Sequence, residues 1–365
     1  MPMPMGSSIL LVARGLDPVG TGGELELAAL GLVAKGLRVV VAVMSTGGAV
    51  PERLAAQGLK VHRLGTRPVV DAATAARLVR LARRVRPDVI LGFGRSQIWP
   101  VVAARVAATG SRAMLRLGRP PIGLAQDRGV RHLDRLLVPA ADLAERWNSE
   151  ISAASRIAVI APGVLPPTPP RLDRTEVARR LGLDPDCRWT VAVAPLEPAS
   201  HIERLVWAMD QLGVVRKDMQ HVLVGAGPLL HAIRRRTRAQ EVAERLVMLP
   251  HSDLLPEVIS QAAVVWQSGD VSLGGCLLDG MARGRPAIAV ESQAARQLIL
   301  PGETGRIVPA LPESEFPRRV FGILEDDALA SRLGAAAATR AAEAFSADRF
   351  VAGLVTALTD SNTHG

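Results

Sequence analysis

The residues best suited to chemistry gather between positions 261 and 308. This segment predicts a buried strand, a glycine-containing turn, a helix, a second strand and a glycine-bounded loop at 302–305. The polar and glycine residues of the turn and helix are Ser268, Asp270, Gly274, Gly275 and Asp279. Glycine turns and helix N-termini present backbone amides to phosphate without relying on any side chain. The glycine turn before the predicted helix can therefore offer backbone amides to an anion.

Glycine-rich turns also follow two other predicted strands. Gly22 and Gly23 come after the first apolar strand, just beyond Arg14, and Gly225 and Gly227 follow a later strand. Two interpretations of the first pair stay open. The two glycines contact a ligand, or they only form a tight turn from strand to helix.

Composition limits the kind of protein. The chain has 365 residues, 48% of them hydrophobic, which excludes disorder and suggests two domains. Its apolar runs are far shorter than the roughly 20 residues that a membrane helix needs, and the N-terminus does not resemble a signal peptide. Two cysteines, Cys187 and Cys276, are too few for a metal cluster or a disulfide framework, and they read as buried apolar fillers. We therefore expect a cytoplasmic protein.

The net charge of +9 comes almost wholly from arginine. It indicates attraction to nucleotide diphosphates or to an anionic membrane surface. The alternative, which we favour, is a genome whose composition supplies arginine wherever a positive charge is needed. If the membrane surface is the partner, the protein is peripheral to the inner face of the membrane. Nucleic acid is disfavoured as a partner because the chain has no tyrosine and only five phenylalanines for base stacking. The arginine run at 234–236 is typical of a solvated face, here on a long helix predicted over 229–245.

Strand and helix signals alternate along the whole chain, which predicts an α/β protein with parallel sheets. A proline-rich segment at 161–173 separates two such series. We therefore expect one domain over 1–168 and a second over 169–345. A final helix over 346–365 carries an apolar face that suits it to cross back to the first domain.

Several motifs occur in a specific order. They are Gly20-Thr21-Gly22-Gly23-Glu24, IAVIAPGV at 157–164, HVLVGAGP at 221–228, DGMARGRP at 279–286, and EDD at 325–327 followed by LG and FS at 333–346. Together they closely resemble the family-4 retaining glycosyltransferases, or glycosyl transferases group 1, over about residues 8–358. The resemblance implies a GT-B fold, in which two doubly wound Rossmann-like domains flank a cleft. The first domain would then hold the acceptor and the second the nucleotide sugar.

The resemblance also implies an activity. A hexose would pass from a nucleotide diphosphate sugar to a glycan or lipid-linked acceptor, with retention and without a metal cofactor. Asp279 would bind the ribose, although it also suits an early helical turn, and Asp270 would hold the sugar. Backbone groups of Gly225, Gly227, Ser268, Gly274 and Gly275 would line the donor, and Arg14, Gly22 and Gly23 would face its phosphates.

The chain departs from the family at positions that carry chemistry. The family's arginine and lysine, which neutralise the diphosphate, align with Pro195 and Ser200, and its first glutamate aligns with Val271. His201 would replace the lysine, or it would only cap a helix. The family's histidine in the first domain falls near Gly118, between Arg116 and Arg119. These departures motivate an alternative, which is a catalytically inactive binding or scaffold protein in polysaccharide or envelope assembly.

Overall fold

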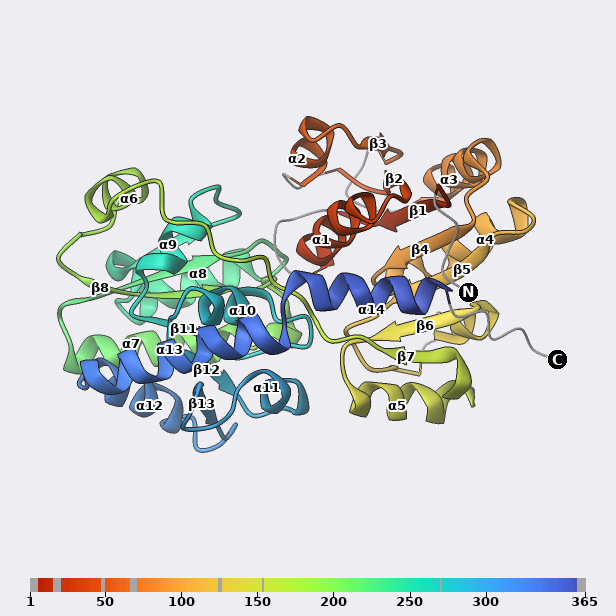
Figure 1. Ribbon diagram of the computed structural model, residues 1–365. Coiled ribbons are helices and arrows are strands. Elements are labelled where there is room, and N and C mark those ends of the chain that lie inside the picture. The colour runs from red at the N-terminus through yellow and green to blue at the C-terminus, as the bar shows by residue number, and fades with distance from the viewer. Residues whose placement is uncertain are drawn as a thin grey trace. The chain divides into compact units, whose positions relative to one another are not determined.

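The computed structural model describes residues 6–15, 21–46, 50–65, 71–123, 127–152, 154–269 and 271–359. Asp270, predicted to hold a sugar, lies outside the described residues. The chain divides into two compact units (Figure 1). Unit 1 is Met1–Leu165 with Phe345–Gly365, and unit 2 is Pro166–Ala344. Among the described residues, no helix is both long and apolar enough to cross a membrane.

The sheet of unit 1 is parallel, with the order β3-β2-β1-β4-β5-β6-β7. Its strands are β1 (Ser8–Ala13), β2 (Arg38–Val43), β3 (Lys60–Arg63), β4 (Val89–Phe93), β5 (Arg112–Arg116), β6 (Arg135–Val138) and β7 (Ile157–Val159). Every residue of β1 and β4 is buried, as expected of central strands with helices on both faces. The strand order reverses between β1 and β4. In such sheets, ligands bind outside the carboxyl ends of the strands at this switch point.

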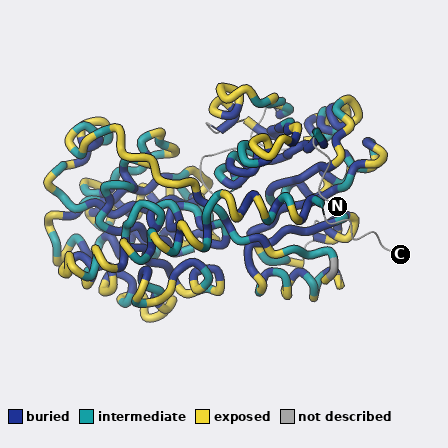
Figure 2. Tube along the Cα trace, in the orientation of Figure 1, coloured by how far each residue is buried: buried dark blue, intermediate teal, exposed yellow. Residues whose placement is uncertain are grey.

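Helices cover both faces of this sheet. They are α1 (Thr21–Ala34), α2 (Val50–Ala56), α3 (Ala72–Val85), α4 (Ile98–Ala107), α5 (Ala141–Ile151) and α14 (Ala347–Thr359). The side chains of α1 and α14 join one buried core, and those of α3, α4 and α5 join the other. In Figure 2 the central strands of this sheet are dark blue, whereas the outer helices alternate between blue and yellow because only one side of each is buried.

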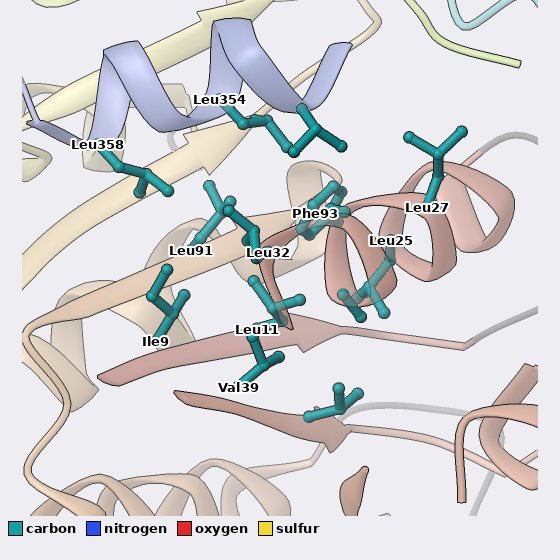
Figure 3. Close-up of a cluster of buried hydrophobic side chains, with 14 of the residues drawn as sticks. Ile9, Leu11, Leu25, Leu27, Leu32, Val39, Leu91, Phe93, Leu354 and Leu358 are labelled. Carbon is teal, nitrogen blue, oxygen red and sulfur yellow. The ribbon is translucent and has the colours of Figure 1, made fainter. Parts of the chain in front are cut away.

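The last helix completes unit 1. Phe350, Leu354 and Leu358 of α14 are buried in the same core as β1 and α1. Figure 3 shows Leu354 and Leu358 together with side chains of β1 and α1. A Cβ on Gly31 of α1 would lie 2.1 Å from the Cγ2 atom of Val351, so this glycine lets the two helices approach closely. The Val164 amide donates to the Phe345 carbonyl at 2.8 Å, which holds the start of this segment. Each large apolar side chain buried here contributes about 1.5–3 kcal/mol.

Unit 2 repeats the architecture with the parallel order β10-β9-β8-β11-β12-β13. Its strands are β8 (Arg188–Val193), β9 (Met219–Val224), β10 (Leu246–Leu249), β11 (Val264–Gln267), β12 (Ala287–Val290) and β13 (Gly305–Val308). Its helices are α6 (Arg174–Leu181), α7 (Ile202–Val215), α8 (Leu230–Ala239), α9 (Leu255–Gln261), α10 (Gly275–Ala282), α11 (Gln293–Leu298), α12 (Glu315–Leu324) and α13 (Asp327–Ala344). The strand order here reverses between β8 and β11.

The long helix predicted over 229–245 is wrong in its second half. Helix α8 ends at Ala239, and a separate 3-10 turn covers Ala243–Arg245. Between them, Glu241 has a left-handed backbone with φ of 55°. This conformation interrupts a helix even where charge and apolar spacing favour one.

Candidate functional site

At the switch point of unit 2, the turn after β11 is hydrogen-bonded to the turn after β8. The buried Ser268 hydroxyl, which follows β11, lies 2.8 Å from the Ser200 carbonyl oxygen and 2.9 Å from that of His201. A Cβ on Gly269 would lie 2.6 Å from the Cα of Ser200, so only glycine fits this contact. The hydroxyl of Ser268 therefore holds the turn after β8 in place. Its predicted contact with a ligand stays a prediction.

His201 stands between a 3-10 turn, Pro198–Ser200, and the first residue of α7. Its side chain is exposed and makes no capping hydrogen bond within the described part of the chain. Its backbone is left-handed, with φ of 48°. A left-handed backbone is unfavourable for a residue with a Cβ, and strained residues of this kind are common at functional sites. The turn at His201 is therefore a candidate ligand contact. The side-chain capping role considered above is absent here.

The glycines predicted to line the donor have two roles, since Gly225 and Gly227 allow close packing whereas Gly275 leaves open space beside the backbone. A Cβ on Gly225 would lie 1.9 Å from the Ala194 carbonyl oxygen, and one on Gly227 would lie 2.4 Å from that of Leu196. These glycines let the turn after β9 pack against the turn after β8. By contrast, no atom lies within 4 Å of the Cβ position of Gly275, the first residue of α10. Gly274 before it has φ of 72°, and a Cβ there would lie 2.7 Å from the Leu278 Cδ2 atom, so the turn is open at Gly275 and closely packed at Gly274.

Asp279 lies in α10, one turn from that open N-terminus. Its carboxylate is partly buried and has no hydrogen-bond partner among the described residues. Burial raises the pKa of Asp279 to about 6, against an opposing attraction from Arg283. The carboxylate is therefore mostly ionised at neutral pH and can accept hydrogen bonds from a ligand.

Arg204 was not among the residues predicted from the sequence. It lies in the first turn of α7, where its amide donates to the His201 carbonyl at 3.1 Å. Its buried Nε atom has no hydrogen-bond partner among the described residues. A cation is unfavourable near a helix N-terminus unless an anion is bound there. That placement is the signal in the sequence that points to Arg204.

Two positions that are charged in the family, its lysine and its first glutamate, are uncharged here and read Ser200 and Val271. Val271 and Ser200 are 3% and 5% exposed. Val271 therefore belongs to the core of the turn, and Ser200 to its contact with Ser268 and Gly269. The permanently charged cation nearest in sequence to Ser200 is Arg204, with the imidazole of His201 between them.

The corresponding edge of unit 1 holds the remaining predicted residues. Arg14 follows β1, and its carbonyl oxygen accepts a hydrogen bond of 2.6 Å from the Ser45 hydroxyl. Gly22 and Gly23 form the first turn of α1. The neighbouring Thr21 packs near Gly94, which follows β4 with φ of 90°. The three residues thus share the switch point of unit 1.

Arg116, at the end of β5, is not free to meet a ligand. Its guanidinium donates to both carboxylate oxygens of Glu24 in α1, at 3.0 and 2.7 Å, and to the Ile160 carbonyl at 2.7 Å. Arg116 is 2% exposed and Glu24 is 4% exposed. This ion pair fixes the start of α1, and with it Gly22 and Gly23, against the sheet.

Comparison with known families identifies part of unit 2. Residues 187–326 match the family described as Glycosyl transferases group 1. The chain contains a glycosyl transferases group 1 domain. The matched residues include both turns of the switch point, Arg204 and Asp279.

Curated glycosyltransferases match parts of this chain. An alpha-D-kanosaminyltransferase of Streptomyces kanamyceticus is 28% identical over 47% of this chain and 45% of its own length. A D-inositol 3-phosphate glycosyltransferase of Streptomyces avermitilis is 26% identical over 71% of this chain and 60% of its own length. The chain thus spans about half the length of the curated relatives it matches.

Solved structures extend the likeness to both units. HepE of Anabaena, crystallised with UDP and glucose, superimposes with a TM-score of 0.82 over 96% of this chain and 99% of its own, at 16% identity. TarM superimposes with a TM-score of 0.76 over 97% of this chain and 99% of its own, at 9% identity. The glycosyltransferase domain is therefore part of a GT-B fold, as the sequence predicts.

Proposed function

We propose that this protein is a retaining glycosyltransferase that moves a hexose from a nucleotide diphosphate sugar to a cellular acceptor. The observation that carries the proposal is Asp279, an ionised and partly buried carboxylate without a hydrogen-bond partner among the described residues, in a domain of this family. A carboxylate in this position suits the two hydroxyls of a ribose. The relatives named above, which are glycosyltransferases, support the same activity.

The diphosphate would lie at the turn before α10. There the positive end of the α10 dipole favours negative charge, whereas the Gly275 amide itself donates to the Leu273 carbonyl at 2.8 Å. Arg204 would supply a cation that the family places elsewhere, with His201 beside it. Preorganised donors of this kind stabilise the charge that develops on the leaving group, each by about 3 kcal/mol.

The chemistry would need no metal ion. The bond between the sugar's anomeric carbon and the phosphate oxygen breaks, and the diphosphate keeps the electron pair. The acceptor hydroxyl then attacks from the same face and gives its proton to the departing phosphate oxygen. Retention follows because the new bond forms on the side from which the diphosphate leaves.

The acceptor would be a glycan or a lipid-linked sugar. A relative from Mycolicibacterium smegmatis, 28% identical over 45% of this chain, is named as a mannosyltransferase acting on phosphatidylinositol monomannoside. Helix α3, whose exposed residues include Arg80, Arg83 and Arg84, supports peripheral contact with an anionic membrane surface. A cytoplasmic location, at the inner face of the membrane, belongs to the same proposal.

A donor screen tests the activity. The protein is incubated with UDP-, GDP- and ADP-sugars, and release of the nucleoside diphosphate is measured, with the Asp279→Asn variant as control. We expect one donor to be hydrolysed or transferred above the variant's background. If calorimetry shows binding of a nucleoside diphosphate but no donor turns over, the binding or scaffold function replaces the enzyme. Absence of binding at millimolar concentration contradicts both.

A further inference from the structure

A cavity of about 630 Å³ opens in unit 1 at the edge opposite to the switch point. Ser8, Arg38 and Lys60, which begin β1, β2 and β3, line it, whereas the switch point lies beyond the carboxyl ends of these strands. The ends of α1 and α3 complete its wall. The proposed glycosyl transfer makes no use of this edge.

The charged groups around the cavity are all basic. Among the described lining residues, Arg38, Lys60, His62 and Arg84 carry or can carry positive charge, and none is an aspartate or a glutamate. The side chains of Lys60 and Arg84 have no hydrogen-bond or ion-pair partner within the described part of the chain. Burial lowers the pKa of His62, and the positive charges of Arg84 and Lys60 lower it further. The local field is therefore positive.

Several arginines of unit 1 outside the cavity form ion pairs. Arg63 pairs with Glu52, Arg53 with Glu26, and Arg105 with Asp134. Arg83 and Arg128 are exposed and form no ion pair within the described part of the chain, so the cavity is distinguished by how its cations gather and not by their lack of partners. The carboxylate near the cavity is Asp88, which is not part of its lining. It accepts a hydrogen bond of 2.7 Å from the Ser8 amide and also attracts the guanidinium of Arg112 on β5.

The rest of the wall is apolar. Val33, Leu37, Val39, Leu59 and Val85 provide it, and Val33 is 43% exposed. A site with a cationic rim and an apolar wall suits an anionic head group attached to a less polar body. Arginine and lysine together match the oxygens of a phosphate monoester or diester.

We propose that this cavity is a second anion site, which binds a phosphate group carried by an organic molecule, through Lys60, Arg84 and His62. The source of the phosphate is a soluble metabolite or the head group of a membrane lipid. Either source uses the same contacts. The site is independent of donor binding in unit 2.

The first experiment follows the ring proton of His62 by NMR while pH and inorganic phosphate are varied. The signal is assigned with the His62→Gln variant. A bound phosphate stabilises the charged imidazolium, so we expect phosphate to raise the pKa of His62 and leave the exposed His231 signal in place. A His62 signal that moves no more than that of His231 overturns the proposal for soluble phosphate.

The second experiment measures flotation with vesicles of a neutral phospholipid, with and without an anionic phospholipid. Binding to the anionic vesicles alone assigns the site to a lipid head group, and an NMR response alone assigns it to a soluble phosphate. Both results support the anion site. Neither response at low salt, where such attractions are strongest, overturns it.

The variant Lys60→Ala/Arg84→Ala tests the location. We expect it to weaken the observed binding by about tenfold or more, because charge-assisted hydrogen bonds are lost. Arg234→Ala/Arg235→Ala removes the same charge from the exposed face of α8 and is the matched control. Equal losses in the two variants show a nonspecific effect of net charge and overturn the assignment. Melting temperature and binding of UDP check that both variants are folded.

Discussion

The two units have the same strand order around the switch point but differ in how the charged side chains there are paired. In unit 1, Glu24 and Arg116 are buried and satisfy each other, and the third arginine contact goes to a backbone carbonyl. In unit 2, Asp279 and the Nε atom of Arg204 have no hydrogen-bond partner among the described residues. An unsatisfied buried group costs about 1–3 kcal/mol. At Arg204, unit 2 therefore tolerates a cost that the Glu24–Arg116 pair of unit 1 avoids. In unit 1 the Oε1 atom of the buried Gln97, which follows β4, is the polar atom without a partner among the described residues.

This difference assigns roles to the two edges. A fully satisfied ion pair fixes the position of α1 and leaves little hydrogen-bonding capacity for a ligand. The unsatisfied groups of unit 2 gain partners only when a ligand arrives. We infer that the switch point of unit 1 is a rigid frame and that of unit 2 is the reactive part.

The largest expected effect comes from breaking the frame. Arg116→Ala leaves the Glu24 carboxylate buried without its cation, which costs about 3–5 kcal/mol. We expect a much lower urea midpoint for unfolding of unit 1, with binding of nucleoside diphosphate by unit 2 retained. Arg63→Ala breaks the exposed pair with Glu52 and serves as the control. If both variants lose stability equally, the buried pair is not the frame.

The next effect concerns the carboxylate of unit 2. Asp279→Asn removes the charge that would accept ribose hydroxyls, and we expect donor affinity to fall by about 10- to 100-fold, or about 1.5–3 kcal/mol. In the wild type, affinity should weaken as pH falls through about 6, where Asp279 takes up a proton. Calorimetry across this range measures both.

The control for Asp279 is the conservative change to glutamate. Asp279→Glu keeps the charge and restores the residue of the family motif, so its pH dependence should persist. The Asn variant should show no step near pH 6. A step of equal size in the Asn variant contradicts the role of Asp279.

A smaller effect separates the phosphate contact from the nucleoside contact. Arg204→Ala should weaken binding of a nucleoside diphosphate by about tenfold and leave the unphosphorylated nucleoside unaffected, because the guanidinium faces negative charge alone. Arg204→Lys should recover part of the loss. Arg234→Ala on α8 is the control for net charge. Equal losses for the nucleoside and the diphosphate contradict a phosphate role.

The fold follows largely from the sequence. Alternating apolar runs separated by Gly and Pro mark the strands and helices of both sheets, and the motif order specifies GT-B. The spacing of Phe350, Leu354 and Leu358 marks a buried helical face, which the structure places in the core of unit 1. The end of α8 could not be predicted, since the left-handed backbone of Glu241 leaves no trace in composition.

The candidate site is harder to predict from the sequence, because the contacts that define it join residues far apart in the chain. Glu24 and Arg116 belong to different elements, so the sequence suggested only that Arg116 stood near a ligand position. The roles of Gly225 and Gly227 in packing depend on backbone distances to Ala194 and Leu196. Arg204 was overlooked because the family motif directs attention to Ser200. The ligand contacts of Gly22, Gly274, Gly275 and Asp279 stay predictions.

The smallest expected effect tests whether His201 acts through its backbone or its ring. His201→Gly removes the imidazole and relieves the left-handed strain, so stability should rise by up to about 1 kcal/mol. If only the turn matters, diphosphate affinity stays unchanged, because Ser268 still holds the carbonyls of residues 200 and 201. If the ring contacts phosphate, diphosphate affinity falls when the imidazole is removed. We expect the first result, since Arg204 already supplies a permanent cation one turn away, and calorimetry of the wild type and the variant with a nucleoside diphosphate decides between them.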